Sequence, residues 1–81
     1  MNVYEEITAV YSRHNKELML SIYDEKDHLL IRSKMPKLIA YKIGDIVDGP
    51  NNQKYIVTGT EDNIFNPKKL HKAKLKRKTE E

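Results

Sequence analysis

Short runs of alternating apolar and polar residues, separated by turn-forming residues, are the feature that most constrains the fold of this chain. The run 18–23 alternates Leu, Leu and Ile with Met, Ser and Tyr, and a second such run over 28–32 follows four charged residues. Alternation with a period of two places successive side chains on opposite faces of a strand. A further pair of β-rich segments, 44–47 and 54–60, flanks the turn formers of 48–52, so the sequence predicts two hairpins.

Residues 2–13 fit two interpretations. As a helix, the segment begins with Asn2 as its cap and has Glu5 in the third position, as in a capping box. As a strand, residues 7–12 alternate Ile, Ala and Tyr with Thr, Val and Ser, which suits a pleated surface. The strand is favoured, because the polar turn 14–16 would then join it to the following run as a hairpin.

The whole pattern predicts a mainly β fold over residues 1–66, a small antiparallel sheet or barrel of five to six short strands with an N-terminal helix as the alternative for its first segment. Gly59 within the last run indicates a bulge or a bend. A chain of this size buries about 60% of the surface that it exposes when unfolded, so its core is thin. The side chains expected to point into that core are Leu18, Leu20, Ile22, Leu29, Ile31, Tyr55 and Val57.

One hairpin carries a resemblance to a known fold. Residues 42–47 read Lys-Ile-Gly-Asp-Ile-Val, and after a polar turn residues 54–59 read Lys-Tyr-Ile-Val-Thr-Gly. This pattern resembles the hairpin of SH3-like small β-barrels, including KOW-type modules, and covers about 20 of the 81 residues. The resemblance implies a small barrel. The preceding three-strand meander is longer than that pattern expects, which leaves an OB-like arrangement open.

Charge is divided sharply along the chain. Residues 1–66 carry eight Lys or Arg against ten Asp or Glu, a net charge of −2, whereas residues 67–81 carry seven Lys or Arg against two Glu, a net charge of +5. In the second segment only Leu70, Ala73 and Leu75 are apolar, and they form no continuous helical stripe. The sequence therefore predicts a basic tail over 67–81, either a frayed helix or disordered, which favours polyanions as partners.

The tail and one face of the sheet together form the candidate site. Basic side chains neutralise phosphates, and an exposed tyrosine beside basic residues can stack on a base, although a half-buried tyrosine needs no ligand. The candidate nucleic-acid-binding residues are Lys68, Lys69, Lys72, Lys74, Lys76, Arg77 and Lys78 in the tail, with Tyr23, Arg32 and Lys54 on the face opposite the core.

Several classes of function are not expected. Cysteine is absent, which excludes disulfides and thiolate metal sites and indicates a reducing compartment, the cytoplasm. The three histidines lie far apart, and the acidic turn 24–27 lacks the glycine and distal glutamate of a calcium loop, so no metal or other cofactor is expected. The sequence has no nucleophile elbow and no phosphate-binding glycine loop, which predicts a protein that is not an enzyme.

Two functions fit these expectations. The first is a non-enzymatic small binding module that contacts RNA, DNA or a ribonucleoprotein through its basic tail. The second is a protein-binding adaptor or inhibitor of the phage or mobile-element type, with a host or phage protein as its partner. No membrane partner is expected, because the tail lacks aromatic residues and a coherent apolar face. The oligomeric state is left open by the sequence.

Overall fold

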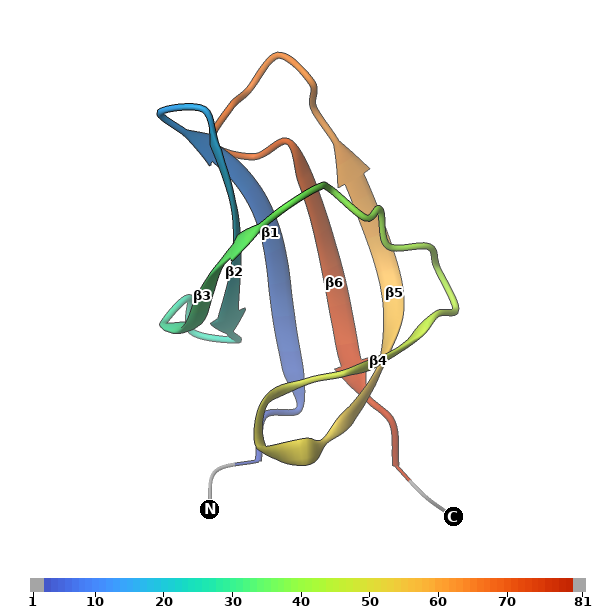
Figure 1. Ribbon diagram of the computed structural model, residues 1–81. Coiled ribbons are helices and arrows are strands. Elements are labelled where there is room, and N and C mark those ends of the chain that lie inside the picture. The colour runs from blue at the N-terminus through green and yellow to red at the C-terminus, as the bar shows by residue number, and fades with distance from the viewer. Residues whose placement is uncertain (1–2, 80–81) are drawn as a thin grey trace.

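Six antiparallel strands form one strongly curled sheet in the computed structural model, which describes residues 3–79 of the chain (Figure 1). The sheet is a half barrel with the strand order β3-β2-β1-β6-β5-β4, so β3 and β4 are its free edges. Among the described residues, the one helical element is a 3-10 turn over Pro50–Asn52. The mainly β fold predicted from the sequence is confirmed. The strands are β1 (Glu6–His14), β2 (Glu17–Asp24), β3 (Leu29–Met35), β4 (Ile46–Asp48), β5 (Lys54–Asp62) and β6 (His71–Arg77).

The first strand decides between helix and strand for the N-terminal segment. β1 pairs antiparallel with β2 on one side and with β6 on the other. Ile7, Ala9 and Tyr11 are at most 3% exposed, whereas the residues between them are only partly buried. The strand is therefore confirmed and the helical interpretation is wrong, because alternate burial is what a strand covered on one face produces. Asn2, the cap of the helical interpretation, lies outside the described residues.

Two tight turns connect the first three strands. Asn15 and Lys16 form the turn between β1 and β2, and both have positive φ (49° and 68°), which matches the right-handed twist of a two-residue hairpin. Asp24 holds the turn between β2 and β3, where its Oδ1 accepts the N–H groups of Lys26 and His28 at 2.9 Å each. The hydrogen bond from His28, more than that from Lys26, keeps the pKa of Asp24 below its usual value.

Residues 71–77 form a central strand rather than a tail. β6 lies between β1 and β5, and His71, Ala73 and Leu75 are at most 2% exposed (Figure 1). The prediction of a frayed helix or a disordered tail over 67–81 is therefore wrong for this segment. The predicted boundary between residues 66 and 67 lies in the loop that joins β5 to β6, so it separates two neighbouring strands of one sheet. The physical reason is the period of the apolar residues. Residues 72–76 read Lys-Ala-Lys-Leu-Lys, which alternates every second residue as in a strand, so the lack of a helical period excluded a helix but not a strand.

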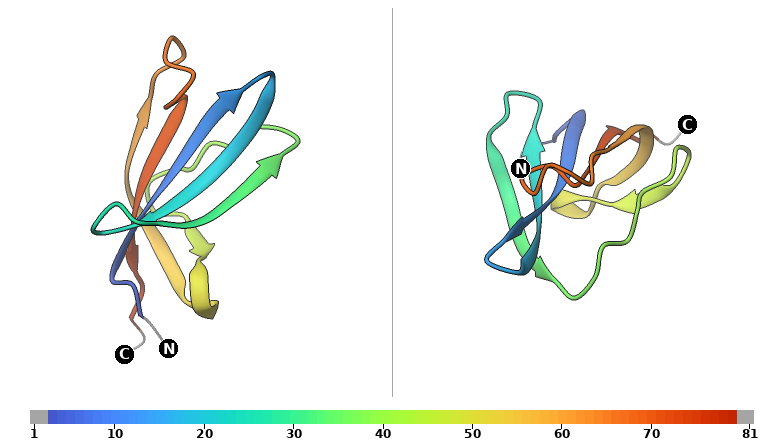
Figure 2. Two further views of the ribbon diagram at one scale, coloured as in Figure 1. Left: turned by 90° about the vertical axis from the view of Figure 1, so that its left-hand side faces the viewer. Right: turned by 90° about the horizontal axis from the view of Figure 1, so that it is seen from above.

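The inner face of the curled sheet holds the core. Segment 36–45 crosses the open side of the half barrel, where the Tyr41 ring stacks on His71 with centroids 5.9 Å apart (Figure 2). The hydroxyl of Tyr55 donates a hydrogen bond to the carbonyl oxygen of Tyr4 at 2.5 Å, and burial raises the pKa of Tyr55. Burial also raises the pKa of Tyr41, with a smaller contribution from Tyr11. The core cluster consists of Ile7, Ala9, Tyr55, Val57, Ala73 and Leu75.

Two side chains predicted to point into the core are exposed instead. Leu29 is 47% and Ile31 is 44% exposed, so the prediction is wrong for both. They lie on β3, which is an edge strand with a neighbour on one side only, and the core cluster does not reach them. Leu20 and Ile22 are partly buried against the cluster. The prediction is confirmed for Leu18, Tyr55 and Val57, which are at most 7% exposed.

Candidate nucleic-acid interface

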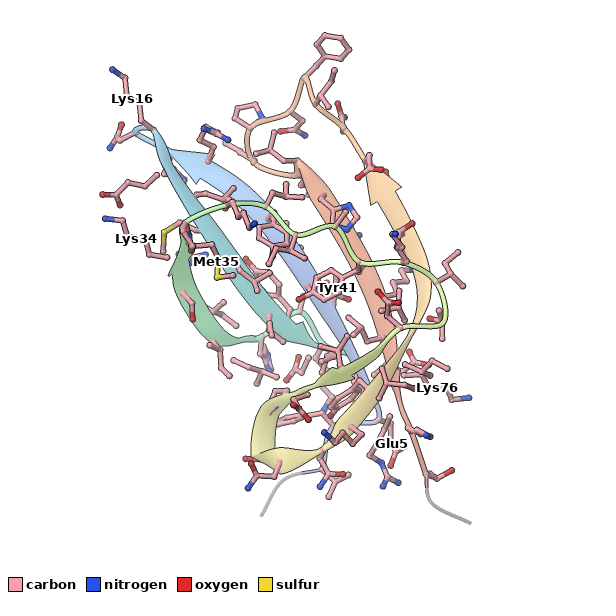
Figure 3. The ribbon with its side chains drawn as sticks, turned by 45° about the vertical axis from the view of Figure 1, so that its right-hand side comes forward. Glu5, Lys16, Lys34, Met35, Tyr41 and Lys76 are labelled. Carbon is pink, nitrogen blue, oxygen red and sulfur yellow. The ribbon has the colours of Figure 1, made fainter. Side chains whose placement is uncertain are left out.

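The outer face of the sheet, opposite the core, carries a row of lysines along β6. Side chains directly opposite one another on paired strands share a face, and Thr8 on the outer face of β1 lies opposite Lys74. Because side chains alternate along a strand, Lys72 and Lys76 point the same way as Lys74, at intervals of about 6.6 Å. We call Lys72, Lys74 and Lys76 the lysine row. Lys76, at the end nearest the chain termini, points into solvent (Figure 3).

No carboxylate of the described chain forms an ion pair with the lysine row. Within residues 3–79 no ion pair includes a lysine of the row, nor Lys68 or Lys69. Glu61 lies opposite Lys72 and Glu6 lies opposite Lys76 across the strands, but neither pair forms an ion pair. Of the seven basic residues that the sequence places between 68 and 78, Arg77 alone is held by a carboxylate of the described chain.

Tyr23 and Arg32 lie on the same outer face as the lysine row. Tyr23 is opposite Thr8, on the other side of β1 from Lys74, which places the two residues about 10 Å apart at the backbone. The Nε of Arg32 donates to the hydroxyl of Ser21 at 3.0 Å, and its Nη2 lies 3.5 Å from the Tyr23 hydroxyl. Ser21 is only 2% exposed, so the guanidinium is fixed beside the tyrosine ring by an anchored partner.

A groove of about 570 Å³ lies between the lysine row and the turn that joins β2 to β3. The lysine row forms one wall, and Glu25 and Asp27 of the turn contribute the other. Thr8 and Thr58 also line it, and Glu6 lies at the same surface. The groove is therefore basic on one side and acidic on the other, with the hydroxyl group of Thr8 on β1 between them.

A bulge in β5 leaves the lysine row open on its other side. The register between β5 and β6 shifts between Val57 and Gly59, which confirms the bulge or bend predicted at Gly59. Gly59 lies opposite Lys74, and a Cβ built on Gly59 would have no atom within 4 Å. The residue of β5 opposite Lys74 thus carries no side chain, while the neighbouring Thr58 donates its hydroxyl to the Lys74 carbonyl at 3.2 Å.

Three of the predicted site residues lie together near the chain termini, on the side of the sheet formed by β4 and β5. Lys54 forms an ion pair with Asp48 across β4 and β5, and the backbone N–H of Lys78 donates to the Lys54 carbonyl at 2.8 Å. Arg77 is bound through Nη2 to Glu5 at 2.9 Å. These residues line a separate hollow of about 550 Å³, so the structure does not bring them together with Tyr23 and Arg32.

Comparison with known proteins gives no match. No protein-family model matches the chain, and neither a curated protein nor a solved structure does. The resemblance to SH3-like barrels over residues 42–59 accordingly stays a prediction, while the curled antiparallel sheet is shown by the structure itself. No helix among the described residues has the length and apolar character needed to cross a membrane.

His71 has a structural role on the inner face. Its Nε2 accepts the backbone N–H of Tyr41 at 2.9 Å, and its Nδ1 lies 2.5 Å from the Asp62 carboxylate. Because Nε2 accepts a hydrogen bond, Nδ1 carries the proton that is donated to Asp62. In the described part of the chain, no group of three His, Asp or Glu side chains is placed to hold a metal ion.

The loop between β5 and β6 contains two apolar residues that are almost fully exposed. Ile64 is 77% and Phe65 is 90% exposed. A signal for this is present in the sequence, because the two apolar residues stand between Asn63 and Asn66-Pro67, which are turn formers. An apolar pair inside a turn has no strand face through which to reach the core.

Proposed function

We propose that the chain is a non-enzymatic module that binds single-stranded nucleic acid across the outer face of its sheet. The observation that carries the proposal is the lysine row, three cations on a central strand that have no carboxylate partner within residues 3–79. A strand fixed on both sides holds them at a constant spacing, which lowers the entropy lost when they bind a chain of phosphates. Lys68 and Lys69 extend the same charge beyond the strand.

The residues on the outer face around the groove favour a single strand over a duplex. Tyr23 offers a ring on which a base can stack, and Arg32 beside it adds a planar cation. Glu25 and Asp27 on the opposite wall can accept hydrogen bonds from the amino groups of bases, as carboxylates do from cytosine. In this arrangement the phosphates lie on the lysine row and the bases point toward Tyr23 and the acidic turn. These base contacts require unpaired bases.

The proposal is tested by replacing the lysine row as a unit. Lys72, Lys74 and Lys76 changed together to Gln are expected to weaken binding of labelled random single-stranded DNA and RNA 20-mers, measured by fluorescence anisotropy at several salt concentrations. Each phosphate contact to a single strand contributes about 0.7 to the slope of log K against log salt, so the slope should fall by about 2.

The matched control removes the same charge elsewhere. Lys16, Lys37 and Lys42, which are exposed and away from the groove, are changed to Gln in one variant. This variant should keep most of the salt slope. Equal losses of affinity in the two variants would show that only the net charge matters, which would contradict the proposed site. No binding by the wild type at low salt would overturn the proposal. Tighter binding of a duplex of the same sequence would contradict its single-strand part.

A second candidate function, protein binding by strand addition, is favoured by the open edge of β3. This seven-residue strand has no neighbour on its outer side, and Leu29 and Ile31 on it are exposed. Ile39 and Ile43 in the crossing segment 36–45 are 59% and 69% exposed. A single stoichiometric partner retained from nuclease-treated lysate, and lost with Ile31→Arg but kept with the lysine-row variant, would support this function.

A further inference from the structure

The loop that joins β5 to β6, residues 63–70, presents an unpartnered aromatic side chain. We call these residues the tip loop. It lies at the end of the sheet farthest from the chain termini (Figure 1). Phe65 in it is 90% exposed and Ile64 is 77% exposed, the two highest values among the large exposed apolar residues of the described chain. Neither side chain contributes to the core cluster.

The tip loop is internally fixed by two consecutive asparagine turns. The Oδ1 of Asn63 accepts the N–H of Phe65 at 3.2 Å, and the carbonyl of Asn63 accepts the N–H of Asn66 at 3.2 Å. The pattern then repeats, because Oδ1 and the carbonyl of Asn66 each accept an N–H at 3.0 Å, from Lys68 and Lys69 respectively. Such turns restrict the backbone that carries Phe65, so the position of its ring is held by an ordered loop.

The loop is also anchored to the neighbouring strand. The N–H of Leu70 donates to the carbonyl of Tyr11 at 2.9 Å, and the N–H of Arg13 donates to the carbonyl of Pro67 at 2.6 Å. These bonds tie the base of the tip loop to β1, which is itself paired on both sides. A rigid support of this kind lowers the conformational entropy that a ligand must remove when it contacts the tip.

Basic residues connect the tip loop to the lysine row. Lys68 and Lys69 follow Phe65 within the loop, and Lys69 and Lys72 line one common hollow of about 270 Å³, together with Glu61, Asn63 and Asn66. From there the lysine row continues along β6 toward the chain termini (Figure 1). A line of cations with an aromatic ring at one end is suited to a linear polyanion that also carries flat apolar groups. Nucleic acid combines both features in one chain.

We infer that Phe65 is a stacking platform for a nucleobase at the place where a single strand leaves the lysine row. Every base has a π face, so this contact is tolerant of sequence and complements the base contacts of the groove. A membrane surface would contact the tip loop but not the lysine row, which runs away from the tip. An apolar pocket on a protein would likewise contact the tip loop alone and leave the lysine row unused. The inference rests on the proposed function, because it requires the strand to lie on the lysine row.

The experiment places the fluorescent base 2-aminopurine at successive positions of a single-stranded 12-mer, since its emission is quenched on stacking. Wild-type protein is expected to quench it strongly at positions near one end of the bound strand. Phe65→Leu keeps an apolar side chain but removes the ring, so this quenching should disappear and affinity should fall about tenfold. Phe65→Tyr is the matched control and should retain both. Circular dichroism confirms that each variant is folded.

The outcomes separate this inference from the proposed function. If the lysine-row variant loses binding while Phe65→Leu changes neither quenching nor affinity, the stacking platform is overturned and the proposed function stands. If wild-type protein binds no single strand at low salt, both are overturned. Sedimentation with vesicles of phosphatidylcholine and phosphatidylserine that is lost in Phe65→Leu, without quenching of any labelled strand, would assign the tip to a lipid surface instead.

Discussion

Close packing of a glycine against an aromatic ring shows how much of this core depends on single residues. Tyr55 is fully buried, and a Cβ built on Gly49 would collide with two carbon atoms of its ring. Gly49 has an extended backbone with φ of −112°, so space rather than backbone conformation excludes a side chain here. The sequence indicates Gly49 only as a turn former, since the collision depends on how the turn folds back over β5.

Gly49→Ala is therefore expected to lower the free energy of unfolding by about 1–3 kcal/mol, because the tyrosine ring or the turn must move. Urea denaturation followed by circular dichroism measures the change. Gly59→Ala serves as the control, since its Cβ would meet no atom within 4 Å, and it should change stability by no more than about 0.5 kcal/mol. Equal effects of the two substitutions would contradict the packing described for Tyr55.

Local patterns predicted most of the strands, and failed where a neighbouring element decides the outcome. The β1–β2 hairpin follows from its alternation and from Asn15 in the turn, both of which are local signals. The sequence did not predict β6, because its many lysines indicated a solvent-exposed segment. Its alternate residues Ala73 and Leu75 are buried because β1 and β5 lie on either side, which the sequence of the segment alone does not show. The sequence indicated the lysines of residues 68–78 as candidates for the site, but not the face that three of them share, which requires the register of β6.

One buried histidine holds the middle of the crossing segment 36–45, whereas the end of the segment is bonded to β5, where Gly44 N–H donates to the Val57 carbonyl and Val57 N–H donates to the Asp45 carbonyl. His71 accepts the N–H of Tyr41, and the two rings stack with an interplanar angle of 13°. His71→Leu leaves the Tyr41 N–H without its acceptor, so we expect a loss of about 1–3 kcal/mol in stability. Hydrogen exchange should show faster exchange of the Tyr41 amide than in the wild type. His14→Leu, at an exposed histidine, is the control. Unchanged Tyr41 protection would show that other contacts hold the segment.

For the whole molecule, the position of β6 joins stability and the proposed binding surface in one element. The strand contributes Ala73 and Leu75 to the core and the lysine row to the outer face. A polyanion bound to the row therefore contacts a strand that the sheet cannot lose, and ligand present at 100 times its dissociation constant should stabilise the fold by about 2.7 kcal/mol. The half barrel consequently cannot be divided into a folded body and a separate binding arm.

A chain that ends at residue 66 tests this directly. Without β6, neither β1 nor β5 keeps the neighbour that lies between them, and the core cluster loses two of its six members. A domain of this size has little stability in reserve, so residues 1–66 are expected to be unfolded, with poor dispersion of amide signals in a 1H–15N NMR spectrum.

Addition of a peptide of residues 67–81 should restore dispersion, because it supplies the missing strand. The same peptide with Leu75→Asp is the control and should not, since it would bury an unpaired charge. A dispersed spectrum for residues 1–66 alone would show that the remaining strands form a stable sheet without β6. The basic segment would then be a separate arm and not a required part of the fold.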